Sequence, residues 1–177
     1  MLLSASASIL LLVDLQQRLM PSIAGGEAVV ANACRLAEAA RLVEVPVLAT
    51  EQNPAGLGGS LPEIAALAAH TLAKTYFDGT RESAFAAFLP EDRATVVVAG
   101  CEAHVCVLQT VLGLLAKGRS VALVRDAVGS RDPANRDAAL ERAKARGAEL
   151  VTTEMVVFEW LETSDHPRFR EALRLVK

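Results

Sequence analysis

Aromatic residues, cysteines and long apolar runs are all scarce in this chain of 177 residues. Phe, Tyr and Trp make up only 4% of a sequence that is 52% hydrophobic, so Ala, Val and Leu must build the core. The three cysteines form an odd number and no export signal precedes them, so we expect reduced thiols and a cytoplasmic protein rather than a disulfide framework. The apolar stretch Ile9–Val13 is too short to span a bilayer, which makes a membrane partner unexpected.

No run of like charge is present either. Lys and Arg number 18 against 21 Asp and Glu, and the two signs are interspersed, so a nucleic-acid partner is not expected. His70, His104 and His166 lie in unrelated segments without metal-ligand spacing, and we predict no metal site. The glycines of residues 56–59 do not open a helix directly after a strand, so the sequence predicts no dinucleotide or phosphate-binding loop and no cofactor.

Apolar runs alternate along the chain with segments of helical period, which is typical of an α/β fold. Strands are expected at Ile9–Val13, Pro46–Thr50, Leu72–Tyr76, Thr95–Ala99, Ser120–Val124 and Glu149–Val151, and helices at Ala28–Val43, Val105–Lys117, Ala134–Arg146 and Val156–Glu162. Continuous apolar runs indicate strands buried on both faces of a parallel sheet. The sequence therefore predicts one domain over residues 1–177, a three-layer, doubly wound, Rossmann-like and mainly parallel sheet of about six strands with helices on both faces.

Ligands of such sheets bind beyond the carboxyl ends of the strands. Asp14, Gln52 and Lys74 stand at or after the first three expected strands, and residues 100–106 follow the fourth. Asp14 could also be a helix cap or a turn residue. Lys74 either pairs with a carboxylate such as Asp14 or is solvated at an edge, because charged residues are rarely buried alone. We expect these side chains to converge on one cleft.

Cys106 is the candidate nucleophile of that cleft. A cysteine near the start of a helix can be a small, inert hydrophobic residue. The unpaired N–H groups and the positive dipole end of a first helical turn would, however, stabilise a thiolate and could also bind an oxyanion. Cys34 and Cys101 are better explained as core residues, and His104 is expected at the surface or the rim of the pocket.

Three segments together carry a resemblance to a known family: LLVDLQQRL, LAKTYFDGT and VVVAGCEAHVCVLQTVLGLLAKG. They resemble the isochorismatase-like cysteine hydrolases, and the similarity extends through TEQNPAGLG, RDAVGSRDP and GAELVTTEMVVFEWL to cover nearly the whole chain. The chain is most similar to the small, metal-free branch of uncharacterised hydrolases. Where nicotinamidases carry metal-binding histidines, this sequence has residues 51–53, Glu-Gln-Asn.

The resemblance implies a catalytic triad of Asp14, Lys74 and Cys106. In amide-cleaving members the aspartate takes the thiol proton, the lysine steadies the charges, and the sulfur attacks a carbonyl to give a thioester that water hydrolyses. The resemblance also implies a cis peptide bond between Cys101 and Glu102, with an oxyanion hole formed by the backbone N–H groups of Glu102 and Cys106. Ala103 departs from the family pattern, which commonly has Thr there and so a hydroxyl in the turn.

These features predict a hydrolase that acts, without a cofactor, on a small amide, carbamoyl or related carbonyl compound. The presence of Cys106 argues against cleavage of the vinyl ether of isochorismate, because members with that activity lack the cysteine. Strand-end geometry predicts a substrate pocket lined by five residues: Gln16, Gln52, Tyr76, Phe77 and Val105.

Two other functions stay open. The chain could be a binding or assembly protein with little turnover, or a redox sensor in which Cys106 is oxidised and Cys101 resolves it. A homo-oligomer is expected in each case, because apolar helix faces such as Val156–Leu161 need to be covered.

Overall fold

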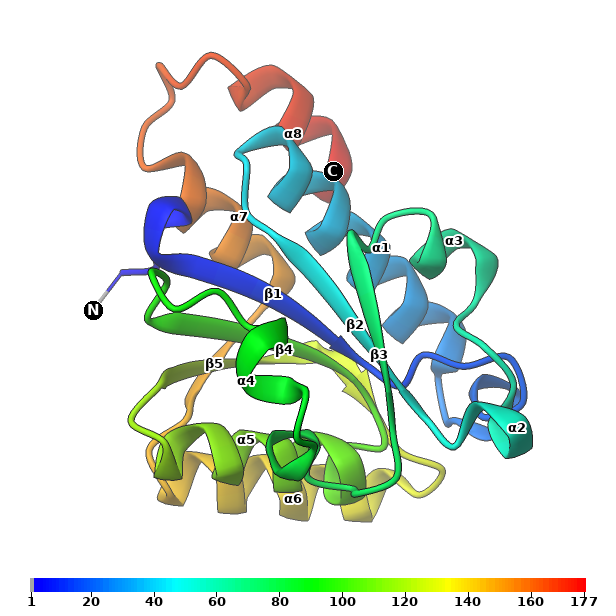
Figure 1. Cartoon of the computed structure of the whole chain (residues 1–177). Coiled ribbons are helices and arrows are strands. Elements are labelled where there is room, and N and C mark those ends of the chain that lie inside the picture. The colour runs from blue at the N-terminus through cyan, green and yellow to red at the C-terminus, as the bar shows by residue number, and fades with distance from the viewer. Residues whose placement is uncertain (1) are drawn as a thin grey trace.

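The computed structural model describes residues 2–177 and contains one six-stranded sheet in the order β3-β2-β1-β4-β5-β6. All five pairs of neighbouring strands are parallel. The strands are β1 (Ser8–Val13), β2 (Val47–Gln52), β3 (His70–Lys74), β4 (Thr95–Cys101), β5 (Ser120–Gly129) and β6 (Glu149–Val151) (Figure 1). The predicted doubly wound, Rossmann-like sheet is confirmed.

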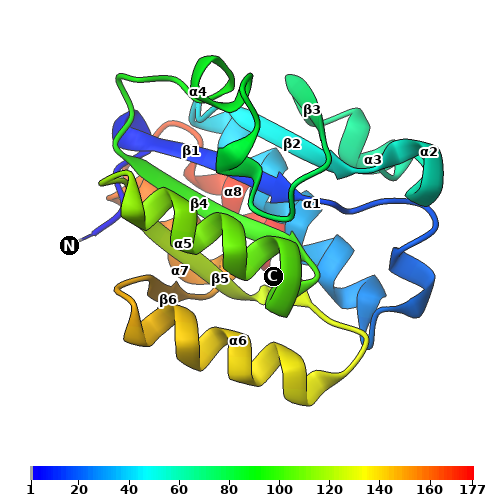
Figure 2. The ribbon, with the colours of Figure 1, turned by 60° about the horizontal axis from the view of Figure 1, so that its bottom comes forward.

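Helices cover both faces of this sheet, as Figures 1 and 2 show. One face carries α1 (Gly26–Leu42), α7 (Thr153–Leu161) and α8 (Phe169–Val176), and the other carries α4 (Phe85–Phe88), α5 (Leu108–Ala116) and α6 (Pro133–Ala145). The remaining helical segments are short: α2 (Pro54–Leu57), α3 (Pro62–Ala65), three 3₁₀ turns at Ala5–Ala7, Met20–Ser22 and Gly79–Arg81, and a π turn at Ala103–Val107. No helix within residues 2–177 is both long and apolar enough to cross a membrane.

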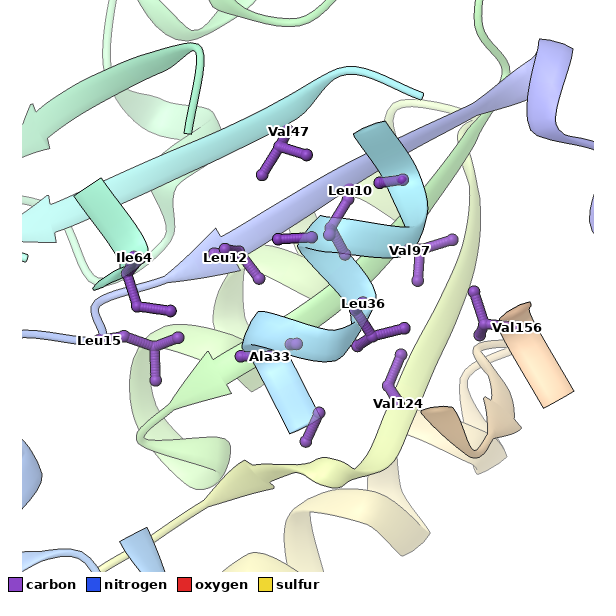
Figure 3. Packing of buried hydrophobic residues seen from close by; sticks show 14 of the residues in the cluster. Leu10, Leu12, Leu15, Ala33, Leu36, Val47, Ile64, Val97, Val124 and Val156 are labelled. Atoms are coloured by element: carbon purple, nitrogen blue, oxygen red, sulfur yellow. The ribbon is translucent and has the colours of Figure 1, made fainter. Parts of the chain in front are cut away.

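Strand β1 lies at the centre of the sheet and is buried along its whole length. Its side chains alternate between two cores, so Leu10 and Leu12 pack toward α1 while Leu11 packs toward α5 and α6. Figure 3 shows the first of these cores, in which Leu10 and Leu12 lie beside Ala33 and Leu36 of α1. Small alanines on α1 let the helix approach the sheet closely, which is how a chain poor in aromatic residues fills its interior.

The strands run further toward their carboxyl ends than the apolar pattern indicates. Strands β2 and β4 each end two residues later than expected, and β5 continues to Gly129. Conversely, β3 ends at Lys74, which pairs with Gln52 in the β2–β3 register. Polar residues at the strand ends interrupt the run of apolar residues, so an apolar pattern does not detect these positions. Their backbone groups still pair with the neighbouring strand. Lys74 and Gln52 therefore lie side by side on rigid strands.

The expectation that the face of Val156–Leu161 needs cover is wrong. Four hydrophobic residues of α7 are buried within the chain: Val156, Val157, Trp160 and Leu161. Trp160 donates a hydrogen bond from Nε1 to Ser8 Oγ over 3.1 Å, which ties α7 to β1. Within α7, large hydrophobic side chains are exposed only at Met155 and Phe158. A homo-oligomer stays a prediction, without support from this helix.

Gly100 fixes how β4 approaches β1. Its φ is +126°, and a Cβ at this position would overlap the backbone carbonyl of Val13. Only glycine accepts both this conformation and this approach. The close contact brings the end of β4, which leads to Cys106, directly beside the residue that follows β1.

Candidate active site

The candidate site lies where the winding of the sheet reverses. After β1 the chain crosses to α1 on one face, and after the neighbouring β4 it crosses to α5 on the other face. A crevice forms at such a switch point, outside the carboxyl ends of the two strands. Asp14 follows β1, and the segment from Glu102 to Cys106 follows β4, so the fold places both at this point.

A buried ion pair joins the ends of β1 and β3. Lys74 donates from Nζ to Asp14 Oδ2 over 2.8 Å, and the side chains of both residues are fully buried. Thr50 Oγ1 donates to the other carboxylate oxygen of Asp14 over 2.7 Å. Asp14 has a φ of +52°, a conformation that aspartate tolerates better than most residues. The carboxylate is thus held from both sides, and Lys74 is paired rather than solvated.

Gln52 connects this pair to the sulfur. Its Oε1 accepts a hydrogen bond of 2.7 Å from Lys74 Nζ and lies 3.8 Å from Cys106 Sγ, within reach of the thiol proton. Its Nε2 donates to the carbonyl oxygen of Thr75 over 2.8 Å. Gln52 was expected to bind substrate. Its amide contacts Lys74, Cys106 and the backbone of Thr75, and a contact with substrate stays a prediction.

Cys106 lies in the π turn and not in the first turn of α5, which begins at Leu108. The pKa of the Cys106 thiol is raised to about 12, because burial and the negative charge of Asp14 outweigh the lowering effect of the positive charge of Lys74. The expected stabilisation of a thiolate is therefore wrong for the resting protein, because desolvation and Asp14 outweigh the cation. The resting sulfur is a neutral thiol that needs a base.

The turn that carries Cys106 is fixed by its backbone. The peptide bond between Cys101 and Glu102 is cis, as the family resemblance implied. The carbonyl oxygen of Glu102 accepts hydrogen bonds from the N–H groups of Val105 and Val107 over 3.1 and 3.2 Å. Within the turn, His104 Nδ1 lies 3.0 Å from Ser130 Oγ, and the His104 side chain is half-buried.

Gln16 does not line a pocket, which corrects the prediction that it binds substrate. The residue is fully buried, and its Oε1 accepts a 2.9 Å hydrogen bond from the N–H of Gln52. Its Nε2 donates to the carbonyl oxygens of Gln52 and Gly58, over 3.1 and 2.6 Å. Gln16 therefore holds the end of β2 in place, because a buried amide takes the nearest backbone partners.

The other expected pocket residues reach the surface to different degrees. Tyr76 and Phe77 are 44% and 50% exposed, and the Arg81 guanidinium lies 4.5 Å from the centroid of the Tyr76 ring. The Tyr76 carbonyl oxygen lies 3.4 Å from Lys74 Nζ, so this segment begins at the ion pair. Val105 is half-buried one residue before Cys106. These three side chains stay candidates for substrate contact.

Sequence reasoning missed three residues that shape the site. Thr50 binds the Asp14 carboxylate, and the segment after β5 supplies Ser130 and Arg131 to the turn around Cys106. The strand-end rule that identified Asp14 and Lys74 would have found Ser130 and Arg131 if the end of β5 had been placed at Gly129. Within residues 2–177, no three side chains of His, Cys, Asp or Glu lie together as a metal site would require.

Comparisons with known proteins show the family and agree with the fold. The family model described as the isochorismatase domain matches residues 8–155. Isochorismatase domain-containing protein 2A of Mus musculus is 37% identical over 171 residues, which cover 97% of this chain and 83% of the mouse protein. The structure of MAR1 ribonuclease from Caenorhabditis elegans superposes with a TM-score of 0.93 at 33% identity, covering 99% and 92% of the two chains. YcaC from Pseudomonas aeruginosa, solved with hexane-2,5-diol and covalent acrylamide, gives a TM-score of 0.90 at 26% identity, covering 98% and 91%.

Proposed function

The chain belongs to the isochorismatase domain family, and from this premise we propose that it is a cysteine-dependent hydrolase of a small amide, carbamoyl or related carbonyl compound. One observation carries the proposal: the fully buried ion pair of Asp14 and Lys74 lies beside Cys106, with Gln52 touching both the ammonium and the sulfur. A base, a cation and a nucleophile within one buried cluster are the parts that acyl transfer requires.

In the first half-reaction, Asp14 takes the thiol proton of Cys106 as the sulfur attacks the substrate carbonyl carbon. A carbon–sulfur bond forms, and the electron pair of the carbonyl double bond moves to oxygen. The backbone N–H groups of Glu102 and Cys106 are the proposed donors to this oxyanion. As the carbonyl re-forms, the carbon–nitrogen bond breaks and Asp14 returns the proton to the leaving amine, which leaves a thioester on Cys106.

In the second half-reaction, Asp14 accepts a proton from water as the water oxygen attacks the thioester carbon. The carbon–sulfur bond then breaks, the acid product leaves, and the proton returns to the Cys106 sulfur. Lys74 keeps its contact with Asp14 throughout and offsets the negative charge that passes between carboxylate and sulfur. No oxidant, metal or cofactor is consumed in this cycle.

The raised pKa of the nucleophile fits a thiol that is activated only when substrate is bound. Burial of Cys101 and of Cys106 raises the pKa of each thiol to about 12. Sensor cysteines are exposed and have a low pKa, so the redox-sensor alternative is disfavoured. A binding or assembly role with little turnover stays the alternative that the experiment below addresses.

The name of the C. elegans neighbour suggests RNA cleavage, but the charge of this chain argues against that activity. The formal net charge is −3 and the basic and acidic residues are interspersed along the sequence, so the sequence contains no basic segment that would attract a polyanion. The YcaC neighbour, by contrast, was solved with covalent acrylamide, and amide-bearing electrophiles are the class of probe that we propose for Cys106.

The experiment is an acylation assay with p-nitrophenyl acetate, which needs no knowledge of the natural substrate. We expect a burst of one p-nitrophenolate per chain. The acetyl group that is transferred at the same time should be found on Cys106 by mass spectrometry. Cys106→Ala and Asp14→Asn should abolish the burst. The matched control is Cys34→Ser, because Cys34 is a half-buried thiol outside the site. Cys34→Ser should leave the burst unchanged, and a burst that survives Cys106→Ala would reject the proposed function.

A further inference from the structure

A second buried carboxylate lies next to the nucleophile and takes no part in the proposed proton transfers. Glu102 accepts hydrogen bonds from the backbone N–H of Arg131 over 2.9 Å and from Arg131 Nε over 3.1 Å to each carboxylate oxygen. The Glu102 side chain is 9% exposed, whereas that of Arg131 is 64% exposed. Partial burial raises the pKa of Glu102, but the hydrogen bonds and positive charge of Arg131 outweigh it and hold this pKa below its usual value. The carboxylate is thus ionised and clamped.

The clamp joins two segments that the sheet brings side by side. Cys101 at the end of β4 pairs in register with Gly129 at the end of β5, so Glu102 and Arg131 follow neighbouring strand ends. The carbonyl oxygen of Glu102 receives the N–H groups of the π turn, as described above, so Glu102 is held by its backbone on one side and its carboxylate on the other. A second link between the same segments is the contact of His104 with Ser130.

We infer that the Glu102–Arg131 pair is a positioning device for the oxyanion hole, an inference that rests on the proposed function. Glu102 would supply one oxyanion donor through its backbone N–H, and the direction of that N–H depends on where the Glu102 side chain is held. The exposed guanidinium of Arg131 and the backbone N–H of the same residue fix the carboxylate from two directions. Glu102 therefore acts through its own peptide group and exchanges no proton with substrate.

Two thiol reagents separate this role from a purely structural one. With acrylamide, the Cys106 thiol gives up its proton as the sulfur bonds to the terminal alkene carbon, the alkene electron pair moves through to the carbonyl oxygen as an enolate, and a proton then returns to the α carbon. With iodoacetamide, the thiol releases its proton, a carbon–sulfur bond forms, the carbon–iodine bond breaks and iodide leaves, so no charge develops on the carbonyl oxygen. The ratio of the acrylamide rate to the iodoacetamide rate at Cys106 reports on the oxyanion hole.

Glu102→Ala should lower this ratio about tenfold or more, since misplacing a catalytic group by about 1 Å can cost a hundredfold in rate. Arg131→Ala should lower it less, because residue 131 keeps its backbone N–H to the carboxylate. The ratio in the double variant should be no lower than in Glu102→Ala alone, since both substitutions break the same Glu102–Arg131 contact. If Glu102→Ala does not fold, Glu102→Gln and Arg131→Ala carry the test.

The control is Asp137→Asn, which removes the carboxylate of another arginine pair, the exposed contact of Arg136 with Asp137 at 2.8 Å. It should leave the ratio unchanged. An unchanged ratio in all Glu102 and Arg131 variants, even with a lower melting temperature, overturns the inference. Failure of the proposed function is seen separately, as an acetyl burst that survives Cys106→Ala, so the two failures are distinguishable.

Discussion

Replacing Asp14 by Asn should lower the pKa of Cys106. Burial is the largest cause of the raised pKa and stays in the variant, but the negative charge of Asp14 is the next cause and is removed. Asparagine has nearly the same shape, so Thr50 keeps a polar partner at this position. Lys74 also loses its counter-ion, and its charge then acts on the sulfur alone. Both changes favour the thiolate.

The size of the effect can be bounded. Two unit charges about 4 Å apart interact by about 4 kcal/mol at an effective dielectric constant of about 20. One pKa unit corresponds to about 1.4 kcal/mol, so the pKa of Cys106 should fall by about 1 to 3 units. With a starting pKa of about 12, ionisation near pH 9 rises from about one thiol in a thousand by tenfold or more. Lys74→Met should act in the opposite direction.

The assay is the pH dependence of iodoacetamide alkylation at Cys106, followed by intact mass in a Cys34→Ser background that removes the half-buried thiol. The acetyl burst should be abolished in the same Asp14→Asn protein that alkylates at lower pH, because the base is lost even though the thiolate gains population. A pKa that rises or stays unchanged in Asp14→Asn would refute the electrostatic reasoning and, with it, the role of Asp14 as base.

Three further predictions concern the frame of the site. Gly100→Ala should destabilise the fold by about 3 kcal/mol or more in urea unfolding, because its Cβ meets the β1 backbone, whereas Gly118→Ala, at a φ of +78° with open space, should cost about 1 to 2 kcal/mol. The free energy of unfolding of the wild type should fall relative to that of Cys106→Ser by about 1.4 kcal/mol per pH unit as pH rises from 9 toward 12. The reason is that the Cys106 thiol ionises first in the unfolded chain, while in the folded protein it keeps its proton. Equal pH slopes would contradict this. Glu82→Gln should speed hydrogen exchange of the Tyr76 amide, which donates a hydrogen bond of 2.9 Å to the Glu82 carboxylate. Backbone hydrogen bonds lower the pKa of Glu82. In the wild type, protection of the Tyr76 amide should therefore persist above the ordinary pKa of glutamate and fade as the pH drops through the lowered pKa of Glu82.

Much of the fold could be predicted from the sequence because apolar periodicity reports directly on burial. The central strand β1 is apolar at five consecutive positions and is buried on both faces, as expected. The pattern fails where strands end in polar residues, as at Gln52 and Lys74. The sequence prediction also omitted α8 (Phe169–Val176), although its one-sided apolar pattern is that of an amphipathic helix.

The candidate site divides in the same way. The convergence of Asp14, Lys74 and Cys106 follows from strand ends, which the sequence locates to within a few residues. The protonation state of Cys106 does not follow, because it depends on how deeply the sulfur is buried and on its distances to two opposite charges. Nor could the role of Gln16 be read from its position, since only the folded backbone shows which carbonyl groups its amide meets.

The distribution of buried charge bears on why these residues are present at all. Within residues 2–177, the buried charged residues are Asp14, Lys74 and Glu102, and all three lie around Cys106. Breaking a buried pair costs about 3–5 kcal/mol, yet replacing the whole pair by apolar residues is often neutral or stabilises by about 1–4 kcal/mol. We therefore expect Asp14→Leu and Lys74→Met each to destabilise the fold in urea unfolding, and the double variant to regain wild-type stability while giving no acetyl burst. A double variant weaker than either single change would mean that the pair serves the fold, and the argument from buried charge to chemistry would fail.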